Sequence, residues 1–315
     1  MKRILVTGGN GFLGSNVVGI LKKDKSYEVS ACSRSLNNID LRDYKIAEKY
    51  FKEIKPDVVV HCAAHVGGIA YNMVKPVEIF EDNALISMNT VKACHKSGAD
   101  WLINFMPNCV YPGHMQEYVE AKWWDGPIHD SVLTYGLPRK MLWGLCFAYK
   151  QMYGFKSLHL ILPNMYGPND HFDSIKSHAL GALISKIVDA KIKNKKTVEI
   201  WGTGKPVREW LFVRDGAEAA KITLKNLKKF ESNDILNIGV RKGISITELA
   251  EMIKEIVGWD GNFIYDASKP DGAMKKILVA DKMKKMLNWE PPTSLRDGIK
   301  ITADRYYKNI VNKYG

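Results

Sequence analysis

The chain has 315 residues, 46% of them hydrophobic, which is enough to bury a sizeable core and leads us to expect two lobes. No run of about 18 apolar residues occurs and a strand-like run comes at once, so we expect no membrane span and no signal peptide. The odd number of cysteines, five, leads us to expect a reducing, cytoplasmic location. The net charge of +12 is dispersed, which favours a lysine-rich solvated surface over a nucleic-acid partner, and five cysteines without CxxC spacing argue against a zinc site.

The first half of the sequence alternates apolar, β-prone runs with helical patterns. Strands are expected at residues 3–7, 27–32, 57–62, 101–105 and 157–162. Helices are expected directly after the glycine-rich segment 8–14 and at 43–54, 84–97 and 135–153. Such alternation predicts an α/β fold with a parallel, doubly wound sheet of the Rossmann type.

The second half has a different texture, with longer polar loops after residue 168. We expect a helix at 179–190, strands at 198–201, 210–213, 235–238 and 263–265, and two helices at the end. A further helix at 245–257 begins with Ser245 and Glu248 at the spacing of a capping box. We therefore predict a dinucleotide-binding domain at 1–165 and a smaller C-terminal α/β substrate lobe at 166–315, with residues of about 210–240 returning to the first domain.

Three glycines mark a phosphate-binding turn. Gly8, Gly11 and Gly14 form a GxxGxxG pattern between the first strand and the first helix. Glycines permit a tight turn there and let a pyrophosphate approach the helix N-terminus closely. The pattern therefore predicts that a dinucleotide binds at the end of the first strand.

The end of the second strand indicates which dinucleotide binds. An acidic residue at this point would bind the ribose 2′-hydroxyl of NADH. The sequence instead has Ser33 followed by Arg34, and a guanidinium pairs well with a 2′-phosphate. We predict NADPH over NADH. His61, at the end of the third strand, is expected to be a buried histidine with hydrogen-bond partners.

Several segments together resemble the GDP-L-fucose synthases, a family of extended short-chain dehydrogenases that reduce and epimerise nucleotide sugars. The resemblance covers essentially the whole chain and rests on residues 61–69, 109–112, 163–168, 177–178, 201–204, 208–209 and 266–272. It implies NADPH-dependent reduction at C4 of a GDP-4-keto-6-deoxy sugar, with epimerisation at C3 and C5. It also implies a homodimer joined through a four-helix bundle.

The resemblance assigns catalytic roles to three residues. Epimerisation beside a carbonyl needs a base on one face of the sugar and an acid on the other. The cysteine and histidine that fill these roles in the family match Cys109 and His178, and the tyrosine that donates a proton during reduction matches Tyr135.

The resemblance also implies two binding sets. The cofactor contacts it implies are Gly8, Gly11, Phe12, Leu13, Gly14, Arg34, Asp40, Ala63, Ala64, Arg139, Pro163 and His178. The substrate contacts it implies are Asn164, Lys186, Trp201, Arg208, Asp271 and Lys276, with Lys275 as the alternative to Lys276. We expect the loop at 113–130 to cover the substrate.

The sequence departs from the family pattern at two catalytic positions. The family serine two residues before the cysteine is Pro107, so Asn108 or water would take its role. The family lysine four residues after the tyrosine is Arg139. On a regular helix Lys140 would face away, because five residues turn about 140° and four about 40°, and only a π-bulge would bring it back. Pro138 fits if it lies in the first helical turn, with Thr134 as the cap.

Three functions remain open on the sequence. The first is a working reductase in which Arg139 replaces the lysine and Asn108 or water replaces the serine. The second is an epimerase with little reductase activity, with Cys109 and His178 intact. The third is a non-catalytic protein that binds NADPH and a nucleotide sugar, although such a protein would have no evident need for Tyr135, Cys109 and His178 together.

Overall fold

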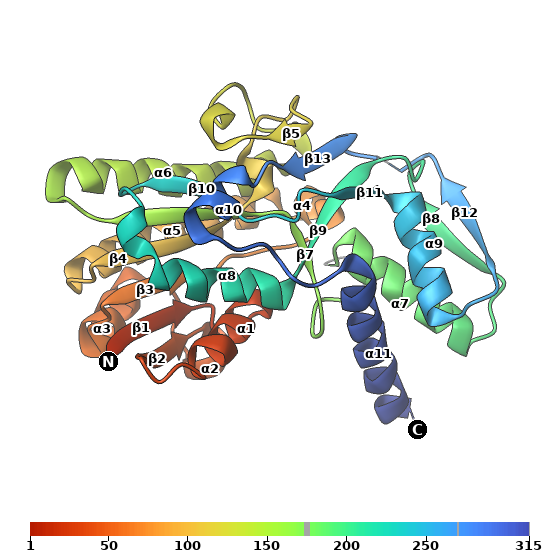
Figure 1. Ribbon diagram of the computed structural model, residues 1–315, viewed down its shortest axis with the longest axis horizontal. Coiled ribbons are helices and arrows are strands. Elements are labelled where there is room, and N and C mark those ends of the chain that lie inside the picture. Colours follow the sequence, from red (N-terminus) through yellow and green to blue (C-terminus); the bar gives the residue numbers. More distant parts are fainter. Residues whose placement is uncertain (173–176, 270, 315) are drawn as a thin grey trace.

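A six-stranded parallel sheet forms the centre of the first lobe (Figure 1). The computed structural model describes residues 1–172, 177–269 and 271–314. The strands are β1 (Lys2–Thr7), β2 (Tyr27–Cys32), β3 (Val58–His61), β4 (Trp101–Pro107), β6 (Ser157–Leu162) and β10 (Asp234–Asn237). They lie in the order β10-β6-β4-β3-β1-β2, and all neighbours are parallel. The predicted doubly wound α/β fold is confirmed.

Helices cover both faces of this sheet, because successive side chains of its strands point to opposite sides and are apolar on both. One layer holds α1 (Phe12–Leu21), α8 (Val213–Lys225) and α10 (Asp281–Leu287). The other holds α3 (Tyr44–Ile54), α5 (Pro76–Lys96) and α6 (Leu133–Tyr153). In β1, Ile4 packs toward the first layer and Leu5 toward the second, and neither side chain is exposed.

The second lobe is smaller and its main sheet is mixed. This sheet has the order β11-β9-β13-β5, with β7 added to β9, and only the β11–β9 pair is antiparallel. Its strands are β5 (Glu117–Tyr118), β7 (Asn164–Tyr166), β9 (Val207–Phe212), β11 (Gly243–Ser245) and β13 (Lys275–Leu278). A separate pair is formed by β8 (Thr197–Trp201) and β12 (Asn262–Asp266). The lobe's helices are α7 (Ala179–Ile192), α9 (Ile246–Val257) and α11 (Leu295–Tyr314).

The chain returns to the first lobe after entering the second. β10 pairs with β6 at the edge of the first sheet, and α8 packs against α1. Met283 and Leu287 of α10 belong to the same apolar core as these elements. The division of the chain into domains at residue 165 stays a proposal.

Several local predictions need correction. α6 begins at Leu133 with Val132 at the N-cap, so Thr134 is not the cap and Pro138 lies in the second turn. α5 begins at Pro76, before the predicted residue 84, because proline is well suited to the first helical position. Val213 begins α8 and does not end a strand. The short strands β5, β7, β11 and β13 were not predicted from the sequence.

The capping box of α9 was predicted correctly. The Ser245 hydroxyl accepts a hydrogen bond from the backbone N–H of Glu248, and the Glu248 carboxylate accepts one from the N–H of Ser245. Two backbone groups that lack partners inside the helix are satisfied in this way.

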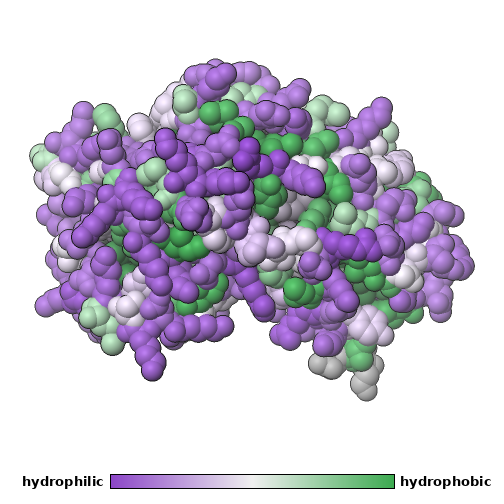
Figure 2. Space-filling view, in the orientation of Figure 1, coloured by the Kyte–Doolittle hydropathy of each residue, from purple (hydrophilic) through white to green (hydrophobic). Residues whose placement is uncertain are grey.

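The surface is mostly hydrophilic on the face that Figure 2 shows, with hydrophobic surface gathered where the lobes meet, near β13 and β11. Among the described residues, no helix is long and apolar enough to cross a membrane. The same part of the chain has no group of side chains that could hold a metal ion.

Candidate cofactor and substrate site

The glycine turn lies where the strand order of the first sheet reverses, between β1 and β3. Ligands of doubly wound sheets bind at this point, outside the carboxyl ends of the strands. Gly8 has a φ of +67°, and a Cβ there would lie 2.8 Å from the backbone of Ala63. A Cβ on Gly14 would lie 2.1 Å from the carbonyl oxygen of Gly8. Only glycine fits at both positions, and the N-terminus of α1, which no side chain caps, is open to an anion.

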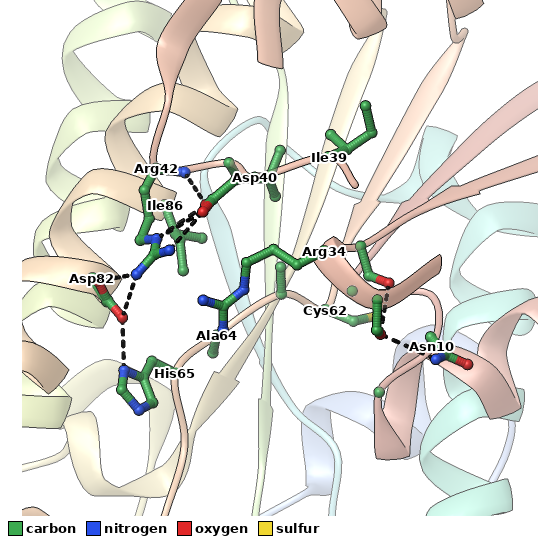
Figure 3. Close-up of a pocket in the computed structure, with 16 residues that line it drawn as sticks. Asn10, Arg34, Ile39, Asp40, Arg42, Cys62, Ala64, His65, Asp82 and Ile86 are labelled. Atoms are coloured by element: carbon green, nitrogen blue, oxygen red, sulfur yellow. Dashed lines mark hydrogen bonds and ion pairs between the residues drawn. The ribbon is translucent and has the colours of Figure 1, made fainter. Parts of the chain in front are cut away.

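A cavity of about 320 Å³ extends from this turn along the ends of β2 and β3 (Figure 3). Arg34 projects into it and has no hydrogen bond or ion pair with any described residue. Ser33 caps the short helix α2 (Arg34–Asn37), and Ser35 accepts a hydrogen bond of 3.1 Å from Asn10. This corner of the cavity therefore offers a free guanidinium and hydroxyl groups, with no carboxylate at position 33.

A hydrogen-bonded chain of charged groups forms the opposite wall of the cavity. Arg42 Nη2 lies 2.6 Å from an Asp40 carboxylate oxygen, and Arg42 Nη1 lies 3.1 Å from Asp82. Asp82 also contacts His65 Nδ1 at 2.8 Å, and the second ring nitrogen lies 3.0 Å from the Tyr71 hydroxyl. Hydrogen bonds from Arg42 hold the pKa of Asp40 below its usual value. Two carboxylates thus neutralise Arg42.

Of this chain of charged groups, only Asp40 was predicted from the sequence. Its members come from the loop before α3, the loop after β3, α4 (Ile69–Val74) and α5, so no local spacing indicates that all of them meet. Asp40 lines the cavity as expected, but both oxygens of its carboxylate already accept hydrogen bonds from Arg42.

Arg139 lies at the carboxyl ends of β3 and β4 with only 2% of its surface exposed. Its Nη2 donates to the carbonyl of Phe105 at 2.5 Å, and its Nη1 donates to the carbonyl of Ala63 at 3.5 Å. The same Nη1 lies 3.5 Å from His61 Nε2, while His61 Nδ1 bonds to the Thr7 hydroxyl at 2.8 Å. The buried Nε of Arg139 has no partner among the described residues.

Lys140 does not replace the family lysine. α6 is a regular α-helix from Leu133 to Tyr153, without a π-bulge, and Lys140 points away from Arg139. Its ammonium donates to the carbonyl of Trp123 at 2.6 Å and lies 4.2 Å from the centre of the Trp124 ring. The lysine therefore ties the 113–130 loop to α6.

Tyr135 and Cys109 lie on elements that pack against each other. Cys109 is in the 3₁₀ turn η1 (Asn108–Val110), and a Cβ on Gly136 of α6 would lie 3.1 Å from the Cys109 carbonyl oxygen. Burial raises the pKa of Tyr135 to about 12, although the Arg139 charge opposes this. Burial likewise raises the pKa of Cys109 to about 11 against the charges of Lys276 and Arg139. Both groups carry their protons at neutral pH.

Asn108 and His178 complete the predicted catalytic set. Asn108 is 6% exposed, and its buried side-chain nitrogen has no partner among the described residues. His178 occupies the N-cap position of α7. Burial, and then the neighbouring His171, lowers the pKa of His178, which keeps its ring neutral at pH 7.

Two basic residues of the second lobe face the same side of its sheet. Arg208 of β9 and Lys276 of β13 are partners in register on neighbouring parallel strands. Lys275 points the other way and forms an ion pair of 2.8 Å with Glu117. Lys276 is electrostatically coupled to Cys109, so it is the lysine that faces the predicted catalytic residues.

A second basic group surrounds Trp201, whose side chain is 49% exposed. The ammonium groups of Lys186 and Lys269 lie 5.5 and 5.6 Å from the centre of its ring. Asp271 accepts two hydrogen bonds of 2.8 Å from Thr203, and its carbonyl accepts one of 3.1 Å from Arg208. The Asp271 carboxylate therefore holds the turn after β8.

The remaining predicted contacts lie between these groups. Pro163 is buried at the end of β6, and Asn164 is half-buried at the start of β7. Ala64 lines the cavity beside His65, while Leu13 is buried in the first turn of α1.

The family model of the NAD dependent epimerase/dehydratase family matches residues 4–239, from β1 through β10. The chain belongs to this family. It is 33% identical over 312 residues to the GDP-L-fucose synthase of Sinorhizobium fredii, which covers 99% of this chain and 97% of that protein.

Solved structures of the family resemble this chain over nearly its whole length. A GDP-6-OMe-4-keto-L-xylo-heptose reductase from C. jejuni is 28% identical, with a TM-score of 0.90, and the match covers 98% of each chain. MlghC, a GDP-mannoheptose C4 reductase from Campylobacter jejuni solved with NADP bound, is 28% identical with a TM-score of 0.86 and covers 97% of this chain and 98% of that one.

Proposed function

We propose that this protein is an NADPH-dependent C4 reductase of a GDP-4-keto-6-deoxy sugar. The observation that carries the proposal is the meeting of the two lobes at Cys109. The charges of Lys276, from the side that we assign to the nucleotide, and of Arg139, from the cofactor side, both oppose the rise that burial causes in the pKa of this thiol. The full-length similarity to GDP-L-fucose synthase and to GDP-heptose reductases supports the same reaction class.

The residues of the first lobe fit a dinucleotide with a 2′-phosphate. The turn at residues 8–14 would hold the pyrophosphate, Arg34 the 2′-phosphate, and Asp40 the adenine amine. Ala63, Ala64, Pro163 and His178 would line the nicotinamide half, where the unpartnered Nε of Arg139 offers a donor. When bound, NADPH supplies the hydride for reduction.

Tyr135 is the proton donor in this proposal. A hydroxyl whose pKa lies at about 12 keeps its proton at neutral pH and delivers it to an oxygen that gains negative charge. The Asn108 amide is the second donor to that oxygen, in place of the family serine that Pro107 excludes. Arg139 places a positive charge beside Tyr135 and so keeps it a stronger acid than burial alone would allow.

The second lobe would hold the GDP portion of the substrate. Arg208 and Lys276 are assigned to the diphosphate, because two half-buried cations on neighbouring strands match two phosphate groups. Lys186 and Trp201 are assigned to the nucleoside, with Asn164 and Asp271 as further contacts.

Epimerisation is the second candidate, and the protonation states of two residues favour it. A protonated Cys109 thiol and a neutral His178 ring supply one acid and one base at pH 7, in the reverse of the base and acid roles that the resemblance implies. Deuterium wash-in at C3 and C5 of the keto sugar in D₂O tests this. Exchange that is absent, or that survives Cys109→Ala unchanged, would rule epimerisation out.

A homodimer through α5 and α6 is the proposed assembly. These helices pack side by side on the first sheet, and both carry exposed apolar residues. Leu85 and Met88 of α5 are 44% and 49% exposed, and Leu137 and Met141 of α6 are 43% and 36% exposed. Their spacing of three and four residues places each pair on one helix face.

The deciding experiment measures NADPH oxidation in the presence of a GDP-4-keto-6-deoxy sugar, with the loss of nicotinamide absorbance as the readout. Binding of NADPH and of GDP is measured in parallel. Turnover supports the reductase. Binding of both ligands without turnover contradicts it and favours the epimerase or the non-catalytic protein.

A further inference from the structure

Glu209 is a buried carboxylate that the proposed reaction does not use. It lies in β9 directly after Arg208, has no exposed surface, and has no ion-pair partner among the described residues. Three backbone N–H groups surround it. Its Oε1 accepts hydrogen bonds from Val240 at 2.6 Å and Arg241 at 2.8 Å, and its Oε2 accepts one from Leu278 at 2.7 Å.

These donors come from two segments, which the carboxylate joins to β9. Val240 and Arg241 follow β10, the edge strand of the first sheet, while Leu278 ends β13 of the second sheet. Side chains alternate along a strand, so Glu209 points to the face of β9 opposite to that of Arg208. The carboxylate therefore lies behind the strand pair whose front carries Arg208 and Lys276.

The space around the carboxylate is closely fitted. A Cβ on Gly239 would lie 2.6 Å from Glu209 Oε1. The φ of Gly239 is not in the left-handed region, so close contact and not backbone strain disfavours a side chain there. Burial raises the pKa of Glu209 to about 7, and the three N–H groups oppose this rise. An apolar side chain here would leave three buried donors without acceptors, which is costly.

We propose that Glu209 is a positioning residue that fixes the separation of Arg208 and Lys276 and thereby sets the affinity for a nucleoside diphosphate. The inference rests on the proposed function, which assigns the diphosphate to these two cations. It predicts that weakening the three hydrogen bonds of Glu209 lowers the affinity for the nucleotide and leaves the affinity of the other lobe for the cofactor unchanged.

The test compares GDP and NADPH binding by calorimetry in the wild type and in Glu209→Gln. Glutamine keeps the volume, but its NH₂ group faces at least one backbone donor in place of an acceptor. We expect the Kd for GDP to rise by about tenfold and the Kd for NADPH to stay unchanged. In turnover, KM for the GDP-sugar should rise while kcat at saturation is retained.

Asp215→Asn is the matched control. Asp215 of α8 is a second buried carboxylate, and it accepts hydrogen bonds from the backbone N–H of Thr293 at 3.0 Å and from its hydroxyl at 2.9 Å, not from β9 or β13. We expect it to lower Tm without changing GDP affinity. A purely structural role for Glu209 would give the same pattern in both variants and would overturn the inference.

Gly239→Ala keeps the proposal testable if Glu209→Gln does not fold, because it moves the carboxylate without removing it. We expect a smaller loss of GDP affinity, again with unchanged NADPH binding. If neither change alters GDP affinity while the wild type binds GDP, the inference alone fails. If the wild type does not bind GDP, the nucleotide assignment of the proposed function fails, and the inference fails with it.

Discussion

Arg139 is the residue on which the reductase proposal depends most. Its guanidinium reaches two strand-end carbonyls, those of Phe105 and Ala63, that a shorter ammonium would not bridge in the same way. The helical period predicted correctly that Lys140 faces away, because the difference between four and five residues follows from helix geometry alone. The acceptors of Arg139 were not predictable, since they come from two different strand ends.

Replacing Arg139 with Met should lower kcat by roughly 10²- to 10⁴-fold. Loss of the positive charge raises the pKa of Tyr135 further and makes it a weaker proton donor. The measurement is NADPH oxidation at saturating keto sugar. Lys140→Met on the same helix is the control and should retain kcat, because its ammonium points away from Arg139 and donates to the carbonyl of Trp123. Equal losses in both variants would contradict the assignment.

Restoring the family pattern with Pro107→Ser and Arg139→Lys should lower turnover. The pocket around Arg139 supplies acceptors for a planar guanidinium, and Asn108 already offers a buried donor. The double variant is compared with the wild type in the same assay. A strong rise in turnover would mean that the native residues weaken a reductase site.

Replacing Arg34 with Ala should raise KM for NADPH by roughly 10- to 100-fold, the size of one or two lost charge-assisted hydrogen bonds. KM for NADH should stay nearly constant, because NADH has no 2′-phosphate to lose contact with. NADH therefore serves as the internal control. An equal rise in KM for NADPH and for NADH would mean that Arg34 does not bind the 2′-phosphate.

At the scale of elements, the predictable parts are those with local signals. Apolar runs separated by helical patterns predicted the first sheet, and the spacing of Ser245 and Glu248 predicted where α9 begins. β13 was missed because Lys275 and Lys276 have low β-propensity. This strand forms because it pairs with β9 and with β5, which are far away in the sequence. The position of Lys276 beside Arg208 could therefore not be predicted from the sequence either.

The neighbouring strands β4 and β6 share a buried polar group. His159 Nδ1 lies 3.3 Å from the Asn104 amide nitrogen, and His159 Nε2 lies 2.9 Å from the Asn233 side-chain oxygen. One nitrogen accepts and the other donates, which suits a neutral ring. Burial lowers the pKa of His159 to about 4.

This histidine should make the protein less stable in acid. Its pKa is lower in the folded chain than the usual 6.5, so the unfolded chain takes up the proton first, and stability is lost as the pH falls from 6.5 toward about 4. In His159→Gln, the drop in unfolding free energy between pH 7 and pH 5 should be about 2 kcal/mol smaller. Urea unfolding at both pH values measures it, and an unchanged drop would contradict the prediction.

At the scale of the whole molecule, two lobes meet at one site and an apolar helix face remains exposed. The family resemblance supplied the roles of Cys109, His178 and Tyr135, which composition and periodicity alone do not give. The structure adds that Arg208 and Lys276 are partners in register, whereas Lys275 pairs with Glu117 and Lys140 with the carbonyl of Trp123.

Met88→Glu with Met141→Glu should convert the proposed dimer into a monomer. The free energy needed to bury two carboxylates in the α5–α6 interface exceeds the free energy that the apolar contact contributes to association. The molar mass is measured by light scattering during size-exclusion chromatography. The control is Ile264→Glu on β12, a more exposed apolar position at 56% exposure, which should stay dimeric. A monomeric wild type would contradict the proposed assembly.

The return of β10 to the first sheet also bears on how the chain folds during synthesis. β6 has β10 as its outer neighbour, yet residues 234–237 leave the ribosome only after β7, α7, β8, β9 and α8 have been made. Until then β6 is an open sheet edge, which is prone to pair with other chains. A fragment that ends at residue 165 would keep that open edge permanently, so we expect it to aggregate even though it contains the whole glycine turn.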